Sequence, residues 1–141
     1  MGASAQQAKN PEVGTWKLNV EKSKYSPGTP AKSGMITVEA AGNGVKYSLT
    51  TVDAQGKATS SAYSASYDGK DMPYTGSTVA DTTSLRRVDA YTVERVDKKA
   101  GKVVTTIRRE YSKDGKSFVA KIKGTNAKGE PVDSVLVWER M

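Results

Sequence analysis

Six glycine-centred turn signals recur along this chain at short intervals. They read GNG at 42–44, AQGK at 54–57, DGK at 68–70, KKAGK at 98–102, KDGK at 113–116 and AKGE at 127–130. Glycine adopts the positive backbone angles that tight hairpins require, and Asn or Asp beside it tolerates them. The segments between these turns are too short for typical helices and are rich in Val, Thr, Tyr and Ile. The pattern therefore predicts short antiparallel strands joined by hairpins.

This spacing predicts ten strands. They are expected at residues 13–20, 35–41, 45–53, 57–67, 71–76, 82–88, 91–98, 102–112, 117–124 and 132–140. Because nearly every connection is a hairpin, successive strands should pair with their sequence neighbours. The expected fold class is all-β: a single up-and-down antiparallel β-barrel of about ten strands with an internal cavity.

One connection, Val20 to Gly34, is longer than a hairpin turn. It contains Pro27, Gly28 and Pro30, which leave room for a helix only between Glu21 and Ser26. We expect this segment to be ordered but mostly irregular, and to lie over one end of the sheet.

The expectation of a cavity comes from a shortage of large apolar side chains. A ten-stranded barrel offers roughly 40 inward positions, whereas the chain has only 14 Leu, Ile, Met, Phe and Trp residues. The segment ATSSAYSASY at 58–67 places Thr, Ser, Tyr and Ala on one face and only Ala and Ser on the other, with no large aliphatic residue on either. Such an interior leaves space for water or a ligand.

Composition excludes several kinds of chemistry. The chain has no Cys and no His, so thiol nucleophiles, disulfides and histidine general bases are excluded, and no metal site or cofactor is expected. No apolar run approaches the ~20 residues that a membrane span requires. The net charge of +7 makes the surface basic, which suits either solubility or an anionic partner.

The first twelve residues are small and polar. The run Ala3-Ser4-Ala5 before Gln6 is typical of the end of a cleaved secretory signal, although an ordinary disordered terminus fits it equally. We expect residues 1–12 to be a disordered remnant of a signal or tag, residues 13–141 to form the barrel, and the protein to be periplasmic or secreted.

The two ends of the barrel segment carry family motifs. Gly14-Thr15-Trp16 on the first expected strand resembles the Gly-x-Trp signature of the lipocalins and their calycin relatives. Trp138-Glu139-Arg140 near the end resembles the aromatic-Glu-basic triplet that ends the fatty-acid-binding proteins. Over Val13 to Met141 the chain is most similar to bacterial secreted proteins with lipocalin-like barrels whose function is uncharacterised. The resemblance implies non-enzymatic binding of a small hydrophobic or amphipathic molecule.

The chain also departs from the fatty-acid-binding pattern. Its proline-containing segment 20–34 cannot supply the two helices that cover the barrel mouth in that family. Leu136 and Trp138 stand where the family has the Arg and Tyr that hold a carboxylate. Arg109 lies near the family's other internal Arg, and a shift of one residue in register would put Arg108 there instead.

Candidate ligand-binding residues follow from strand alternation. Arg109 and Tyr111 share a face of the strand at 102–112, where a buried guanidinium would bind either a ligand carboxylate or an internal acid. The aromatic candidates that would line the cavity with rings and hydroxyls are Tyr47, Tyr63, Tyr67, Tyr74 and Trp138.

Two further residues are expected to close one end of the barrel. In an up-and-down barrel the first strand meets the last, which brings Trp16 near Trp138 and Arg140. Arg140 is expected to lie across the indole ring of Trp16.

Two other functions remain open at this point. An enzyme of the same fold could act on such a ligand, using a Tyr, an Arg and a carboxylate such as Glu110 or Glu139. Alternatively, an outward basic stripe could bind an anionic envelope component; its candidates are Arg86, Arg87, Arg95, Arg108, Lys121 and Lys123. Nucleic-acid binding is not expected, because no aromatic residues are interleaved with that stripe. A monomer with one small apolar or amphipathic ligand is the expected form.

Overall fold

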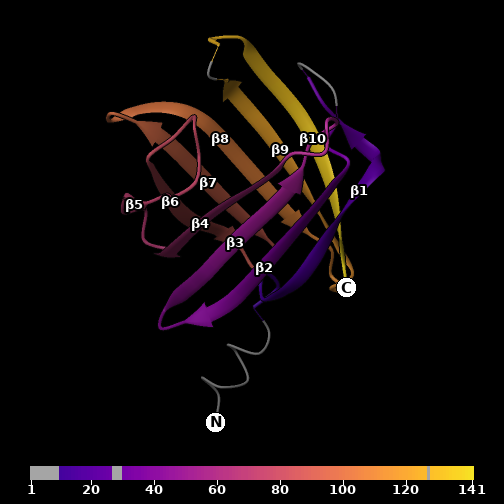
Figure 1. Cartoon of the computed structure of the whole chain (residues 1–141). Helices are drawn as coiled ribbons and strands as arrows, with labels where there is room; N and C mark the ends of the chain where they lie inside the picture. Colours follow the sequence, from indigo (N-terminus) through magenta and orange to yellow (C-terminus); the bar gives the residue numbers. More distant parts are fainter. Residues whose placement is uncertain (1–9, 27–29, 127) are drawn as a thin grey trace.

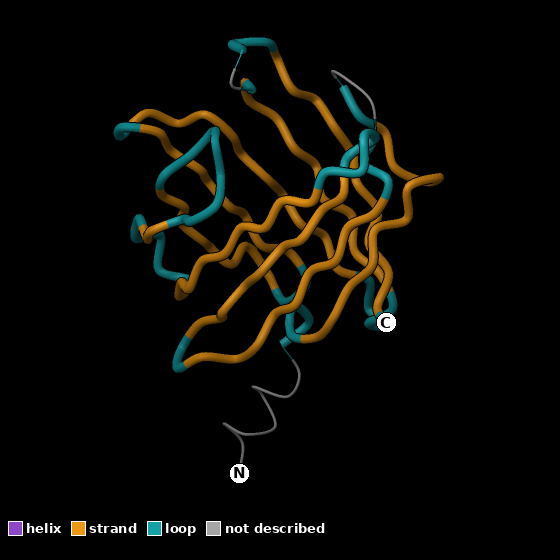
Figure 2. Tube along the Cα trace, viewed as in Figure 1, coloured by secondary structure: helices purple, strands orange, loops and turns teal. Residues whose placement is uncertain are grey.

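The computed structural model describes residues 10–26, 30–126 and 128–141, and every regular element in them is a strand. The strands are β1 (Gly14–Lys24), β2 (Ser33–Ala41), β3 (Gly44–Val52), β4 (Ala58–Ser66), β5 (Met72–Pro73), β6 (Thr82–Asp89), β7 (Thr92–Lys99), β8 (Lys102–Tyr111), β9 (Ser117–Thr125) and β10 (Pro131–Arg140). Figure 2 shows them joined by short loops. Within the described part of the chain, no helix has the length and apolar character to cross a membrane.

The strands form one closed antiparallel sheet. Their order is β4-β3-β2-β1-β10-β9-β8-β7-β6-β5, so successive strands pair except β4 and β5, which form the two edges, and the first strand also pairs with the last. In Figure 1, β1–β4 cross in front of β7–β10. A bridge between Ala62 of β4 and Thr75 joins the two outer edges. The predicted fold class, an up-and-down barrel of about ten strands, is confirmed.

Two elements differ from the predicted ranges by more than two residues. β1 continues to Lys24, because the chain bulges after Asn19 and then resumes pairing with β10: Asn19 pairs with Val137 and Lys24 with Val135. The predicted irregular crossing is therefore shorter than residues 20–34, and its residues 27–29 lie outside the described part. β5 is two residues long instead of six, and it pairs with β6 only through Met72 and Pro73.

Alternation along the strands places the core as predicted. Trp16 and Leu18 of β1, and Phe118 and Ala120 of β9, are buried with inward side chains. Their neighbours Lys17 and Lys121 are exposed. The period of two thus separates interior from surface over most of the sheet.

The ordered structure begins earlier than residue 13. Residues 1–9 lie outside the described part, so the predicted signal remnant stays untested there. Asn10 to Glu12, which we assigned to the same disordered segment, instead pack against the barrel, and Glu12 is fully buried. That assignment is wrong for these three residues because Glu12 has buried partners that sequence spacing does not reveal.

Candidate binding site in the barrel

Trp16, Arg140 and Phe118 pack together near the junction of the first and last strands. Trp16 of β1 pairs with Arg140 of β10, and the Arg140 guanidinium lies 4.2 Å from the centre of the indole ring. The Trp16 Nε1–H donates to the Glu12 carbonyl at 3.1 Å. Phe118 packs edge-on against the indole, with ring centres 4.9 Å apart.

Arg140 also explains the glycine of the Gly-x-Trp motif. Its guanidinium donates to the backbone carbonyls of Val13 at 2.8 Å, Pro11 at 3.3 Å and Gly115 at 2.6 Å. Gly14 has a φ of +143°, and a Cβ there would overlap the Arg140 guanidinium. The motif therefore allows Arg140 to fix the chain that leads into β1.

The buried carboxylate of Glu12 accepts hydrogen bonds from three side chains. Its Oε2 accepts hydrogen bonds from Arg109 Nη1 at 3.1 Å and from the Tyr111 hydroxyl at 2.7 Å. Its Oε1 accepts one from the Tyr67 hydroxyl at 2.5 Å. Arg109 Nη1 also donates to the Tyr63 hydroxyl at 3.1 Å. Both carboxylate oxygens of Glu12 are thereby satisfied by the protein itself.

A second buried ion pair lies farther along the barrel. Arg95 of β7 donates from Nε to Asp97 Oδ1 at 2.8 Å and from Nη2 to Asp97 Oδ2 at 2.7 Å. The Thr83 hydroxyl donates to the same Oδ1 at 2.7 Å. Burial acts to lower the pKa of Arg95, but the hydrogen bond and charge of Asp97 outweigh it, so that pKa lies above its ordinary value.

Tyrosine rings connect the two ion pairs. Tyr47 and Tyr63 stack with ring centres 4.5 Å apart. Arg109 lies 4.8 Å from the ring centre of Tyr47, and Arg95 lies 5.3 Å from that of Tyr63. Tyr74 approaches Arg95 at 4.9 Å. Cations over ring faces add attraction in a desolvated interior, so the two pairs form one connected polar layer.

An inner pocket of about 200 Å³ lies beside this polar layer. Its apolar wall comes mainly from β2, β3, β8, β9 and β10, and its polar wall from the two arginines, Asp97, Tyr47 and Thr105. The apolar lining residues are Ile36, Leu49, Ile107, Phe118, Ala120, Ile122, Leu136 and Trp138. The pocket is thus amphipathic.

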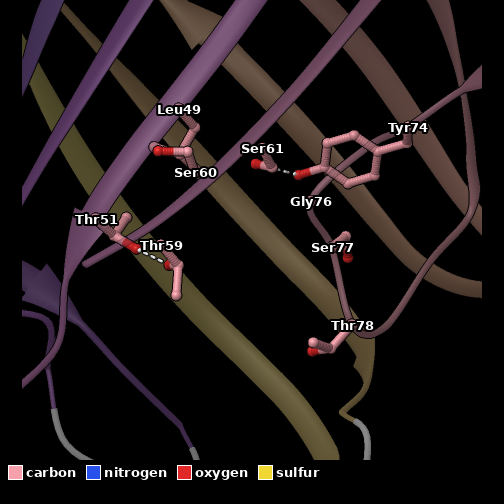
Figure 3. A pocket seen from close by; sticks show the side chains of 9 residues that line it. All are labelled: Leu49, Thr51, Thr59, Ser60, Ser61, Tyr74, Gly76, Ser77 and Thr78. Carbon is pink, nitrogen blue, oxygen red and sulfur yellow. Dashed lines mark hydrogen bonds between the residues drawn. The ribbon is translucent and has the colours of Figure 1, made fainter. Parts of the chain in front are cut away.

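A second pocket of about 200 Å³ lies between the ends of β3 and β4 and the loop after β5 (Figure 3). It is lined mostly by hydroxyl-bearing residues, including Thr51, Thr59, Ser61 and Tyr74. Leu49 borders both pockets. The two pockets are therefore neighbours.

The predicted ligand-binding residues occupy three different places. Tyr47, Arg109 and Trp138 line the inner pocket, and Tyr74 lines the second. Tyr63, Tyr67 and Tyr111 line neither described pocket and instead bond to Arg109 or Glu12. Arg109 faces inward and Arg108 is exposed, which settles the register in favour of Arg109.

Sequence reasoning missed Glu12, Arg95 and Asp97. Arg95 was a candidate for the outward basic stripe, but it is 4% exposed and faces the interior. Strand alternation was the signal that could have placed Arg95 and Asp97 on the inner face, because they follow the apolar Val93 at intervals of two residues. Glu12 precedes the first strand, so no periodicity applies to it. Among the described residues, no group of three or more potential ligands is arranged to hold a metal ion.

Buried tyrosines predict a loss of stability at alkaline pH. Burial raises the pKa of Tyr63 from 10.0 to about 12 and also raises those of Tyr47 and Tyr111. Because the folded state stabilises the neutral phenol, each buried tyrosine contributes to the free energy of unfolding. For Tyr63 this contribution is on the order of 3 kcal/mol; it is complete below pH ~10 and is lost as pH rises toward ~12. Urea unfolding at several alkaline pH values should show this slope, and Tyr63→Phe should reduce it. Tyrosinate absorbance from all seven tyrosines near pH 10 in a still-native barrel would contradict the prediction.

Comparison with known proteins supports the fold. No family model and no curated protein matches the sequence. The crystal structure of Rv2717c from M. tuberculosis is similar with a TM-score of 0.56 and 17% identity, covering 97% of each chain. Zebrafish ileal bile acid-binding protein complexed with cholic acid is similar with a TM-score of 0.54 and 14% identity, covering 93% of this chain and 99% of that one. Both similarities concern the fold.

Proposed function

We propose that this protein binds a small apolar or amphipathic molecule inside its barrel, without chemistry. The observation that carries the proposal is the inner pocket of about 200 Å³, with one apolar wall and one polar wall. Pockets of this character, mostly apolar with a few fixed polar groups, are typical small-molecule sites. The similarity to a barrel that was crystallised with cholic acid supports the same class of function.

The polar layer suits binding more than catalysis. The charged groups at the inner pocket are held in ion pairs, Arg95 with Asp97 and Arg109 with Glu12. A general acid or base must exchange its proton with a reacting group, and these groups are already engaged with one another. They fix the shape of the polar wall.

A matched pair of substitutions on β9 tests the site. Ala120 faces the inner pocket, so Ala120→Phe should fill it and weaken binding of a fluorescent apolar probe at least about tenfold, with a modest cost from overpacking. Val119, the adjacent residue, does not line the inner pocket, so Val119→Phe should leave probe affinity unchanged. Equal effects of the two variants on probe binding would contradict the proposal.

The two tryptophans provide an independent readout. Trp138 lines the inner pocket, whereas Trp16 does not. A ligand in the pocket should therefore change the fluorescence of Trp16→Phe, which keeps Trp138, and leave that of Trp138→Phe nearly unchanged. Native mass spectrometry of the purified protein would identify any molecule that remains bound.

A further inference from the structure

We infer, building on the proposed function, that the barrel selects uncharged ligands with a hydroxyl-bearing head group over carboxylates. A monoacylglycerol or a fatty alcohol has this chemistry, and a fatty acid does not. The inference comes from the charge balance of the interior and from the hydroxyl lining of the second pocket.

The buried charges of the described residues cancel. The charged side chains that are buried are Glu12, Arg95, Asp97 and Arg109, two of each sign. Arg95 is bound through Nε and Nη2 to both oxygens of Asp97. Arg109 Nη1 is shared by Glu12 and Tyr63. Each guanidinium therefore already has a carboxylate partner from the protein.

A ligand carboxylate would find no unpaired cation at the inner pocket. It would lose its hydration on entry, and the nearest arginines are already neutralised. Asp97 also lines this pocket and would repel it. A neutral ligand avoids both costs and still gains from the apolar wall.

The second pocket offers the complementary groups for a neutral head (Figure 3). The Thr51 and Thr59 hydroxyls bond to each other at 3.0 Å, and those of Ser61 and Tyr74 do so at 3.0 Å. A hydroxyl donates one hydrogen bond and accepts two, so each pair keeps capacity for a ligand. No charged residue lines this pocket.

The position of the pockets orients the ligand. Leu49 borders both, with the apolar wall on one side and the hydroxyls on the other. An apolar tail would lie against Ile122 and Leu136, and the head group would lie near Ser61 and Tyr74.

Three ligands with the same tail test the selection. Decanoic acid, decanol and monodecanoylglycerol would each displace a fluorescent apolar probe at neutral pH, where the acid is ionised. Decanoate should bind at least about tenfold more weakly than the two neutral ligands. Equal or tighter binding of decanoate, with the probe still bound by the protein, would overturn the inference and leave the proposed function standing. Failure of the probe and of all three ligands to bind would overturn both.

A charge variant makes the test specific. Asp97→Asn removes the negative partner of Arg95, so the ratio of decanoate affinity to decanol affinity should rise about tenfold or more. The control is Asp133→Asn, because Asp133 is an exposed residue on β10. An unchanged ratio of decanoate to decanol affinity in Asp97→Asn would overturn the inference.

If Asp97→Asn fails to fold, a second variant tests the inference. Ser61→Ala removes a hydroxyl from the second pocket and should weaken monodecanoylglycerol severalfold. Decanoate should be affected less. An equal loss for both ligands would contradict the assignment of the head group to this pocket.

Discussion

Replacing Glu12 by Gln is expected to lower the free energy of unfolding by about 3–5 kcal/mol. The side chain keeps its size but loses its charge. Arg109, 3% exposed, then remains buried without its carboxylate partner. Breaking one side of a buried pair is costly because the remaining charge is neither hydrated nor neutralised. Urea unfolding followed by circular dichroism would measure the loss.

The control for this variant is Glu139→Gln. Glu139 forms only an exposed pair with Lys22 at 3.8 Å, and such pairs contribute at most about 1 kcal/mol. A double variant, Glu12→Gln with Arg109→Met, should recover part of the loss because it removes the stranded charge. Strict additivity of the two single effects would show that the pair is not coupled.

Replacing Trp16 by Ala is expected to cost about 3–5 kcal/mol of unfolding free energy. The indole is 0% exposed, and its packing extends to Tyr111 and Phe118. Truncation would leave a cavity, remove the hydrogen bond to the Glu12 carbonyl and take away the ring beneath Arg140. Thermal and urea unfolding would both report the change.

Ligand affinity separates this role from direct binding. Trp16 does not line the inner pocket, so the folded fraction of Trp16→Ala should bind the apolar probe with nearly the original affinity. Trp138→Ala removes part of the pocket wall and should change the affinity. A stable Trp16→Ala protein with altered ligand preference would contradict the role of Trp16 as a closure residue.

The strands could be predicted from sequence because turn chemistry and alternation are local. Gly42 and Gly56 mark hairpins, and the predicted strands around them agree with β2, β3 and β4 to within two residues. The predicted length of β5 was wrong because a pattern of apolar residues does not show whether the edge of a sheet has a partner. There, the Tyr74 N–H still donates to the Asp81 carbonyl in register with the β5–β6 pairs, but the next residue, Thr75, donates to Ala62 of β4.

The candidate site was only partly predictable, for a physical reason. Arg109 and Tyr111 were found because they share a face of one strand. Their partner Glu12 lies almost a hundred residues away, and only the closed barrel brings it to them. The prediction named an internal acid as one possible partner for Arg109, but the sequence could not distinguish it from a ligand carboxylate.

The pairing of β1 with β10 also constrains when the barrel can form during synthesis. Trp16 finds its partner only after Arg140 has been made, so β1 keeps an unpaired edge until β10 has been synthesised. Such nonlocal pairing slows folding, and exposed edges invite association with other chains. A nascent chain that ends before Pro131 lacks all of β10 and cannot close the sheet. Closure of the sheet therefore waits for the synthesis of β10.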